Sequence, residues 1–221
     1  MKTDSTDFSP CDYVTQARDN HPQPLTRQLF EAMLKDYKVR NLCQKVREHT
    51  SLSEKYKISL PAITWQAKFS GKPRTDQNAI PTGLFCIDVD IHHDHYFRDL
   101  FQEQGPEAAY AWAEKEAHER ALRWTLMQEQ QDAKGCTPDE DLSILAIHIS
   151  PSGTGVHVVA CCNEACKSIA DNQNRLAQLL HTEFDPVCKD WARIFFVVPR
   201  EDWYYIDMPM LFNEQEKLNP S

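Results

Sequence analysis

Two aspartates in an apolar segment are the residues of this sequence best suited to chemistry. Asp88 and Asp90 lie within residues 84–91, whose other members are all apolar. Side chains alternate between the two faces of a β-strand, so both carboxylates project to one side and Ile87 and Val89 to the other. Two like charges held ~6 to 7 Å apart on an apolar strand are unfavourable unless a cation offsets them. The pair predicts a divalent-metal site; the simpler alternative is a strand that ends in solvent with both acids hydrated.

A turn rich in serine and glycine separates two further apolar runs, within residues 147–159. If residues 151–154 form a hairpin loop, Ser150 opposes Gly155, and His148 lies across from His157 on one face of the sheet. Backbone amides and hydroxyls of such a loop can hold phosphate oxygens. The segment therefore predicts an anion-binding turn, against the alternative of two packed histidines without a ligand. The residues proposed to contact this ligand are Ser150, Ser152, Gly153, Gly155, His148 and His157.

A third segment, residues 184–196, brings an acid and a guanidinium to the start of another apolar run. Asp190 can complete a metal site, and Arg193 can hold phosphates through two parallel hydrogen bonds. Asp185 is the alternative third acid. Without a ligand, Asp190 and Arg193 would form only a local ion pair.

Composition limits the classes of function. The 221 residues contain 24 Lys and Arg against 33 Asp and Glu, a net charge of −9, which argues against a protein that coats nucleic acid by bulk electrostatics. Lys68, Lys72 and Arg74 form a local basic group that suits a template or primer strand. No run of ~18 apolar residues is present, so we expect no membrane span. The N-terminal residues do not have the pattern of a secretory signal, so the eight cysteines are expected to be reduced thiols in the cytoplasm.

The periodicity of apolar residues predicts an α+β protein. Residues 1–24 are polar and are expected to form a flexible arm, and the rest one domain, 25–221. Helical spacing occurs over about 25–49, 96–131 and 164–182, with Thr26 as a cap. Short strand-like runs fall at 60–69, 83–91, 143–150, 156–162, 193–198 and 203–206. Strands joined both by hairpins and by helical crossovers predict a mixed β-sheet covered by helices.

The order of these motifs resembles the archaeo-eukaryotic primase superfamily. The pattern Asp-x-Asp on a strand, a Ser-Gly turn that leads to His157, and Asp190 to Arg193 before a later strand is closest to the N-terminal domain of virulence-associated protein E. The resemblance covers about residues 58–208, after a helical lead-in at 25–57. It implies a primase-polymerase catalytic core with an RRM-like sheet and an additional N-terminal helical and β unit.

The resemblance also implies a chemistry. Such domains join nucleotides on a nucleic-acid template with two divalent cations, Mg²⁺ or Mn²⁺, and zinc is not expected. Asp88 and Asp90 match the metal-binding pair, His157 matches the residue that contacts nucleotide phosphate, and Asp190 is the later acid. The implied partners are nucleoside triphosphates, a DNA template and primer, and a helicase. Many members have Ser where this chain has Gly155, which puts the nucleotide contacts in question more than the metal ligands.

Three other functions remain open. A rolling-circle initiator would use Tyr204 or Tyr205, but the two histidines flanking one apolar residue that such enzymes need are absent. A metal-dependent phosphodiesterase would use Asp88 and Asp90 with His92 and His93. The third is a catalytically silent module that binds nucleotide or nucleic acid inside a replication protein. Residues 92–95 are expected to form a solvated loop rather than a separate metal site.

Overall fold

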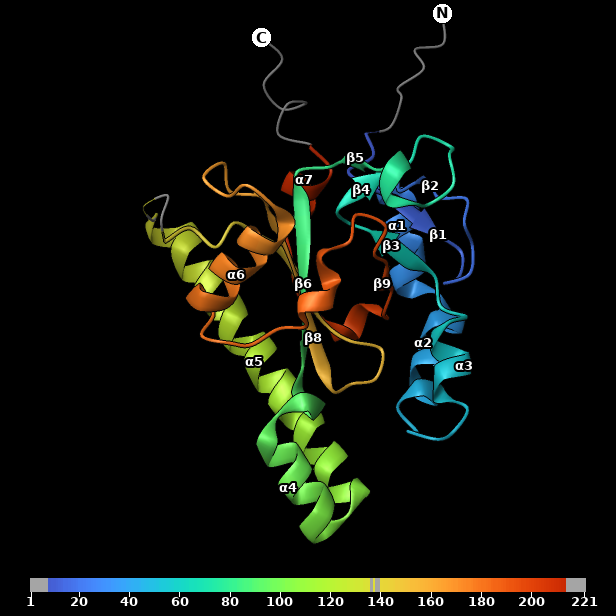
Figure 1. Ribbon diagram of the computed structural model, residues 1–221, viewed down its shortest axis with the longest axis vertical. Helices are drawn as coiled ribbons and strands as arrows, with labels where there is room; N and C mark the ends of the chain where they lie inside the picture. The colour runs from blue at the N-terminus through green and yellow to red at the C-terminus, as the bar shows by residue number, and fades with distance from the viewer. Residues whose placement is uncertain (1–7, 136, 138–139, 214–221) are drawn as a thin grey trace, which may run out of the picture.

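The computed structural model describes residues 8–135, 137 and 140–213, and they form an α+β fold in three layers (Figure 1). Long helices form one outer layer, a four-stranded sheet lies in the middle, and a unit built mostly from the N-terminal third of the chain forms the other outer layer. The predicted fold class is confirmed. None of the helices in the described part of the chain combines the length and the apolar character needed to cross a membrane.

The central sheet contains β6 (Leu84–Asp90), β7 (Ile144–Ile149), β8 (Gly155–Cys161) and β10 (Trp203–Ile206), in the spatial order β10-β7-β8-β6. Its pairings are all antiparallel, so the expectation of a mixed sheet is wrong. β6 and β7 run in the same direction across a helical crossover, but β8 lies between them and pairs with both. The order of elements, βαββαβ, is that of RRM-like domains. The last strand, however, pairs here with β7 rather than with β6, the first.

Helices cover one face of this sheet. They are α4 (His95–Gln104), α5 (Pro106–Lys134) and α6 (Ile169–Leu179), and a one-turn helix, η2 (Ile91–His93), joins β6 to α4. α5 presents a buried alanine at every fourth position from Ala109 to Ala121, and small side chains allow it to lie close to the strands. Gly105, with φ of +88°, and Pro106 separate α4 from α5.

The opposite face packs against the N-terminal unit. The N-terminal unit has a sheet of its own, in the spatial order β2-β1-β3-β9. Its strands are β1 (Asp12–Val14), β2 (Gln23–Pro24), β3 (Ala62–Thr64) and β9 (Phe195–Phe196). Its helices are α1 (Arg27–Lys35), α2 (Tyr37–Val46) and α3 (Ser53–Lys57). Thr26 caps α1 as expected, since its hydroxyl accepts from the Leu29 amide. The smaller elements are β4 (Ala67–Lys68), β5 (Ile80–Pro81), η1 (Asp76–Asn78), η3 (Pro186–Lys189), η4 (Arg200–Asp202) and α7 (Met208–Leu211).

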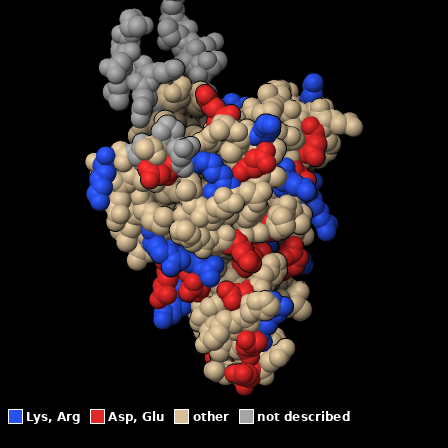
Figure 2. All heavy atoms as spheres, turned by 60° about the vertical axis from the view of Figure 1, so that its left-hand side comes forward, with Lys and Arg blue, Asp and Glu red and all other residues tan. Residues whose placement is uncertain are grey.

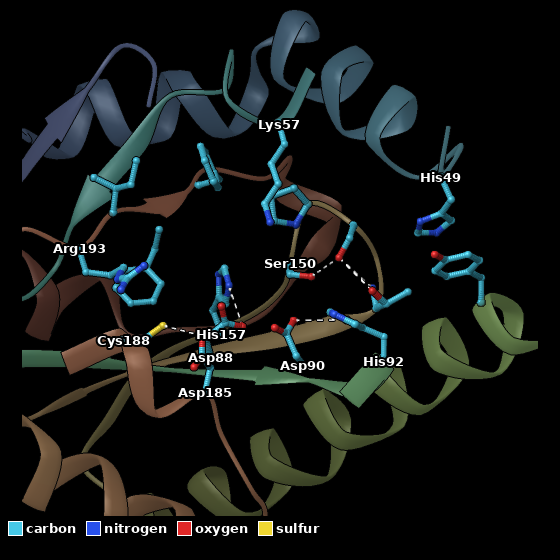
Figure 3. Close-up of a pocket in the computed structure, with 17 residues that line it drawn as sticks. His49, Lys57, Asp88, Asp90, His92, Ser150, His157, Asp185, Cys188 and Arg193 are labelled. Atoms are coloured by element: carbon cyan, nitrogen blue, oxygen red, sulfur yellow. Dashed lines mark hydrogen bonds and ion pairs between the residues drawn. The ribbon is translucent and has the colours of Figure 1, made fainter. Parts of the chain in front are cut away.

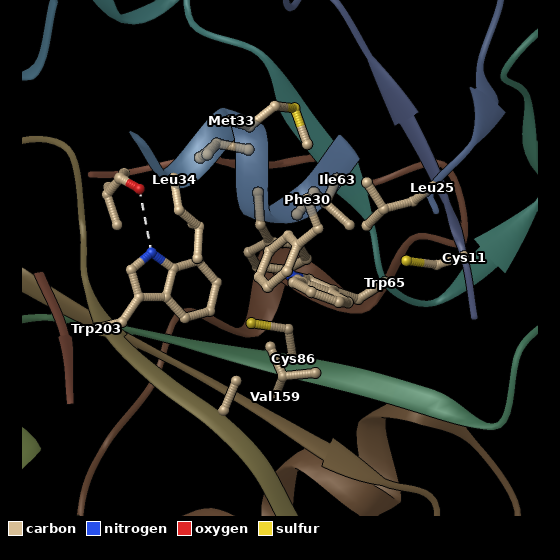
Figure 4. Packing of buried hydrophobic residues seen from close by; sticks show 14 of the residues in the cluster. Cys11, Leu25, Phe30, Met33, Leu34, Ile63, Trp65, Cys86, Val159 and Trp203 are labelled. Atoms are coloured by element: carbon tan, nitrogen blue, oxygen red, sulfur yellow. Dashed lines mark hydrogen bonds between the residues drawn. The ribbon is translucent and has the colours of Figure 1, made fainter. Parts of the chain in front are cut away.

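Aromatic side chains join the N-terminal unit to the central sheet (Figure 4). Phe30 of α1 meets Trp203 of β10 edge to face, with ring centroids 5.3 Å apart, and contacts Trp65 at 6.3 Å. Cys86 and Val159 of the central sheet lie in the same buried cluster. Both units therefore share one core, and their relative position is set by apolar packing.

The expected flexible arm at residues 1–24 is wrong for the part that the structure describes. β1 pairs with both β2 and β3, and Cys11 and Val14 are buried. The buried Asp12 carboxylate accepts a hydrogen bond of 2.7 Å from the Phe69 amide. A polar composition did not exclude this strand, because β1 is only three residues long and its pairing with β2 and β3 relies on backbone hydrogen bonds more than on apolar side chains. The domain boundary at residue 25 therefore falls inside the folded unit, while residues 1–7 lie outside the described residues.

Candidate active site

A ladder of polar side chains crosses the central sheet on the face toward the N-terminal unit. In the strand register, Asp88 of β6 is opposite His157 of β8, which is opposite His148 of β7, which is opposite Trp203 of β10. The Nε2 atom of His157 lies 3.3 Å from Oδ1 of Asp88. The predicted pairing of the two histidines on one face is confirmed, and the ladder follows from the two-residue period of each strand.

A cavity of about 420 Å³ opens over the Asp88 end of this ladder, and we call it the active-site pocket (Figure 3). Its walls come from the end of β6, the turn between β7 and β8, the segment 185–196, α3, and residues near the ends of α2 and α5. The lining residues are His49, Lys57, Asp88, Asp90, His92, Tyr110, Ser150, Pro151, Ser152, Thr154, His157, Asp185, Cys188, Arg193, Ile194, Phe195 and Phe196. Residues far apart in the sequence thus meet at one hollow.

The two aspartates of the pair are in different electrostatic environments. Burial raises the pKa of Asp88, but the adjacent His157 and then Lys57 more than offset it, so the pKa lies below its usual value. Burial and the nearby Asp88 charge raise the pKa of Asp90. Oδ1 of Asp88 is buried and has no hydrogen-bond partner within the described residues. Asp88 is thus held ionised, and a cation in the pocket would relieve the unfavourable charge on Asp90.

The turn between β7 and β8 presents hydroxyl groups to the pocket. The Oγ atoms of Ser150 and Ser152 lie 2.9 Å apart, and Ser152 Oγ lies 3.0 Å from Oγ1 of Thr154. At Gly155 an added Cβ would lie 3.0 Å from the Val89 carbonyl oxygen and 3.2 Å from Oδ1 of Asp90. Glycine at 155 therefore lets the turn approach β6, and a serine at this position would crowd the Val89 carbonyl, so that the two segments would have to separate by a few tenths of an ångström.

Gly153 has a different role from the one expected. Its φ of +80° closes the turn, and its Cα faces Glu114 of α5 and Arg47. It is not among the residues that line the active-site pocket. Gly153 shapes the turn rather than contacting a ligand there.

Two cations face the pocket from different elements. Arg193 donates through Nη2 to the Val187 carbonyl at 2.8 Å and to Oδ2 of Asp190 at 2.9 Å, while its buried Nε has no partner in the described chain. Lys57, at the end of α3, lies with Nζ 5.8 Å from the Phe196 ring centroid. Sequence reasoning missed Lys57, because no local signal distinguishes it from the neighbouring Lys55.

The third acid at the pocket is Asp185, and the expectation of Asp190 is wrong in this respect. The Asp185 amide donates to the Asp88 carbonyl oxygen at 2.8 Å, so the backbone at Asp185 lies directly beside β6. The Asp190 side chain is 50% exposed, pairs with Arg193, and lines a separate hollow with Arg74 and Asp76. The one-turn helix η3 lies between the two acids and directs them to different sides.

His148 does not contact the pocket, which corrects its assignment as a ligand residue. It is 1% exposed, its ring centroid lies 4.2 Å from that of Trp203, and it meets His157 edge to face at 4.8 Å. Burial lowers the pKa of His148 to about 3. A neutral His148 supports the ring of His157 from below, so it positions His157 rather than a ligand.

The expected basic group lies apart from the pocket, and its proposed contact with template or primer stays a prediction. Lys68 donates to the Ser9 carbonyl and lies over the Phe8 ring. Arg74 donates to the carbonyls of Ala192 at 2.7 Å and Ala17 at 2.9 Å, while Lys72 is exposed. These bonds to partly buried carbonyl oxygens let Lys68 and Arg74 tie the N-terminal segment to the fold. None of the three lines the active-site pocket.

Other candidates from the sequence are placed as follows. Tyr204 shares a hydrogen bond of 2.6 Å with His118, and Tyr205 donates to Asp132 at 3.0 Å, both on the face covered by α5. Neither tyrosine lines the active-site pocket, where a nucleophile would have to lie. The described cysteines are free thiols, and Cys161, Cys162 and Cys166 do not form a metal-binding group there.

The segment after β6 is exposed at His93 and His95, as expected, but it forms the one-turn helix η2 rather than a loop. The helix η2 brings single ligand atoms of Asp90, His92 and His93 within 4.8 Å of one another. Nδ1 of His92 lies 3.7 Å from Oδ1 of Asp90. These residues could hold a metal ion.

His49 and Tyr110 lie at the rim of the pocket. Their rings stack with centroids 3.8 Å apart and planes 6° from parallel, which links the N-terminal unit to α5. His49 Nε2 is 3.7 Å from Oε1 of Glu114. Neither ring had a sequence signal, because the contact joins segments about 60 residues apart.

No protein-family model, no curated protein and no solved structure matches this chain. The geometry of the pocket therefore carries the functional argument.

Proposed function

We propose that this protein is a nucleotidyltransferase of the primase-polymerase type, which joins nucleotides on a nucleic-acid template with two divalent cations. The observation that carries the proposal is the register of Asp88 against His157 on a strand that ends in Asp90, all three facing one pocket. The resemblance of the motif order to archaeo-eukaryotic primases supports the same reaction. The pocket volume of about 420 Å³ is within the ~300 to 1,000 Å³ of small-molecule sites.

The acids at the pocket fit a divalent-metal site. The buried Oδ1 of Asp88 accepts no hydrogen bond within the described residues and has His157 Nε2 3.3 Å away as its ion-pair partner, while Asp90 and Asp185 supply further oxygens. Such oxygens are the ligands that Mg²⁺ and Mn²⁺ prefer. When bound, two such ions lower the pKa of an attacking 3′-hydroxyl and neutralise charge on the α-phosphate and the leaving pyrophosphate. The chain would hold them through Asp88 and Asp90, with Asp185 as the third acid.

The other pocket residues suit a triphosphate. Lys57 and Arg193 provide positive charge from two sides, and His157 adds an imidazole whose position is set by Asp88 and His148. The hydroxyls of Ser150, Ser152 and Thr154 offer hydrogen bonds to phosphate oxygens. Nucleoside triphosphates are thus the proposed substrates, with a DNA template and primer as the second partner.

The nucleic-acid contact is proposed to be local. Acidic and basic side chains are intermixed over the face shown in Figure 2, and the net charge is −9. Binding by bulk electrostatics is therefore disfavoured, and we expect the strand to be held near the pocket. A helicase domain is a proposed partner, and the free thiols suit the proposed cytoplasmic location.

The test is primer extension and de novo dinucleotide synthesis with labelled ribo- and deoxyribonucleotides in Mg²⁺ and in Mn²⁺. We expect Asp88→Asn to abolish incorporation and Asp185→Asn to lower it ~100-fold or more, because each removes a charged oxygen ligand. Asp190→Asn is the matched control: it makes the same charge change five residues away, and asparagine can still accept from Arg193. We expect its activity within about 3-fold of wild type.

Two outcomes of this assay would contradict the proposal. Full incorporation by Asp88→Asn would refute the assignment of the metal-binding pair. Binding of nucleotide without incorporation under every condition would identify a catalytically silent module instead.

A metal-dependent phosphodiesterase is the second candidate, favoured by the group Asp90, His92 and His93 beside Asp88. Imidazole and carboxylate ligands together are common in metal-dependent hydrolases. Cleavage of labelled DNA without added nucleotides, lost in Asp88→Asn, would support this function over nucleotidyl transfer.

A further inference from the structure

We infer that Asp90, His92 and His93 form a binding site for a first-row transition-metal dication, of the class of Zn²⁺ or Co²⁺. The inference goes beyond the proposed nucleotidyl transfer and holds whichever reaction the pocket performs. It departs from the expectation, drawn from the sequence, of Mg²⁺ or Mn²⁺ alone.

The first support is geometric. Asp90 is the last residue of β6, and His92 and His93 lie in the helix η2 that follows directly. The turn from strand to helix brings the ligand atoms of these three residues toward one point. Their ligand atoms lie within 4.8 Å of one another. Bonds of ~2.0 to 2.2 Å in a tetrahedral site separate ligand atoms by ~3.4 Å, so small side-chain rotations are enough to close around an ion.

The second support is that these donors are free to bind. In the described part of the chain, no group donates a hydrogen bond to the Asp90 carboxylate, and its ion-pair partner is His92 at 3.7 Å, longer than a hydrogen bond. The His92 and His93 rings contact each other with centroids 4.3 Å apart, and His92 also packs against Phe97. Packing thus restrains the His92 ring beside the Asp90 carboxylate without using the nitrogen atoms.

The neighbouring histidine shows the contrast. Nδ1 of His95 lies 3.1 Å from Nη2 of Arg98, so this imidazole is occupied by a guanidinium. A cation beside it would also be repelled by Arg98. His95, the first residue of α4, is therefore a control two residues after His93.

The donor set selects the class of ion. Two imidazole nitrogens and one carboxylate oxygen are a typical zinc or late transition-metal set, whereas Mg²⁺ prefers oxygen ligands and retains its water. Three protein ligands also leave positions open for water or substrate. The set therefore favours an ion that can take part in chemistry over a closed structural site.

The site lies between two hollows. Asp90 lines both the active-site pocket and a second cavity of about 530 Å³, while His92 lines the first and His93 the second. Arg120 and Arg123 lie in the wall of the second cavity. An ion held by these residues would stand where a group from either side could reach it.

The test is a titration of the full chain, without nucleotide, with Co²⁺ followed by visible absorption and with Zn²⁺ and Mg²⁺ by calorimetry. We expect one Co²⁺ with ligand-field bands of nitrogen and oxygen coordination, displaced by Zn²⁺, and Mg²⁺ binding at least ~100-fold weaker. We expect His92→Ala/His93→Ala to weaken Co²⁺ binding ~100-fold or more, and His95→Ala to leave it within about 3-fold. Circular dichroism checks that each variant is folded.

Three results would overturn the inference. They are wild-type Co²⁺ affinity in the double histidine variant, an equal loss in His95→Ala, and Mg²⁺ binding as tight as Co²⁺. If the cysteine thiols held the Co²⁺, binding would persist in the His92→Ala/His93→Ala variant. That result would contradict the proposed site. The metal site and the proposed function are tested independently. If the protein binds Co²⁺ through His92 and His93 but incorporates no nucleotide, the metal site is supported and only the proposed nucleotidyl transfer is refuted.

Discussion

At the scale of the residue, the ladder from Asp88 to Trp203 shows how one side chain determines the state of the next. His148 has no access to solvent and lies between Trp203 and His157, so its charged form is strongly disfavoured. His157 packs against neutral His148 on one side and meets the Asp88 carboxylate on the other. A buried neutral imidazole thus orients the residue that faces the pocket.

His148 makes stability depend on pH. Its pKa falls from 6.5 in the unfolded chain to about 3 in the fold, so between these values the unfolded state binds the extra proton and stability is lost as pH falls. The slope from this residue is ~1.4 kcal/mol per pH unit. We expect urea unfolding of His148→Gln, compared with wild type from pH 7 to pH 4, to show a correspondingly shallower loss. Parallel pH profiles for both proteins would contradict the burial of a neutral His148.

At the scale of the element, an ion pair connects α2 to the segment that leads into β10. Nη2 of Arg47, at the end of α2, lies 2.6 Å from Oδ2 of Asp202, whose side chain is 5% exposed. Arg40, two turns earlier in α2, pairs with the neighbouring Glu201 at 2.6 Å, but both of these side chains are over 40% exposed. The two pairs join the same elements and differ chiefly in burial.

Removal of either arginine gives a matched comparison. We expect Arg47→Met to lower the free energy of unfolding by ~3 kcal/mol, because it leaves the Asp202 charge buried without its partner. Arg40→Met should cost under ~1 kcal/mol, because water solvates Glu201. Urea titrations of both variants measure the difference, and equal losses would show that burial of Asp202 is not what makes its pair important.

At the scale of the whole molecule, the pocket exists only because two layers meet. The central sheet supplies Asp88, Asp90 and His157, and the N-terminal unit supplies Lys57 across the hollow. The shared apolar core around Phe30 and Trp203 sets the separation of the layers. Binding of a triphosphate between them would therefore depend on a charge from each side.

Lys57 tests this arrangement. We expect Lys57→Met to raise the KM for nucleoside triphosphate, or the Kd of a fluorescent analogue, by ~10-fold or more, because a charge-assisted contact to phosphate is lost. Stability should change little, because Lys57 forms no ion pair in the described chain. Lys55→Met, on the same helix and exposed away from the pocket, is the control. A similar change in both variants would place the triphosphate elsewhere.

Much of the site could be predicted from the sequence where the signal is local. The alternation in residues 84–91 put Asp88 and Asp90 on one face, and the length of the Ser-Gly turn set His148 opposite His157. The same pattern could not show that His148 is buried, since Trp203 covers it from a strand about 55 residues later. It also could not choose between Asp185 and Asp190, because a single helical turn decides which side each faces.

Local patterns were enough to predict the α+β class and the faces of the strands, because side-chain period and turn chemistry are properties of neighbouring residues. The resemblance of the motif order to primases stays a prediction. The antiparallel strand order, the packing of residues 8–24 and the place of Lys57 in the same pocket as Asp88 could be seen only in the folded molecule. These depend on apolar packing between segments far apart in the chain, and its free energy is set by the shape of the whole core. A short polar strand such as β1, or one lysine among several, has no local pattern that reveals its partner.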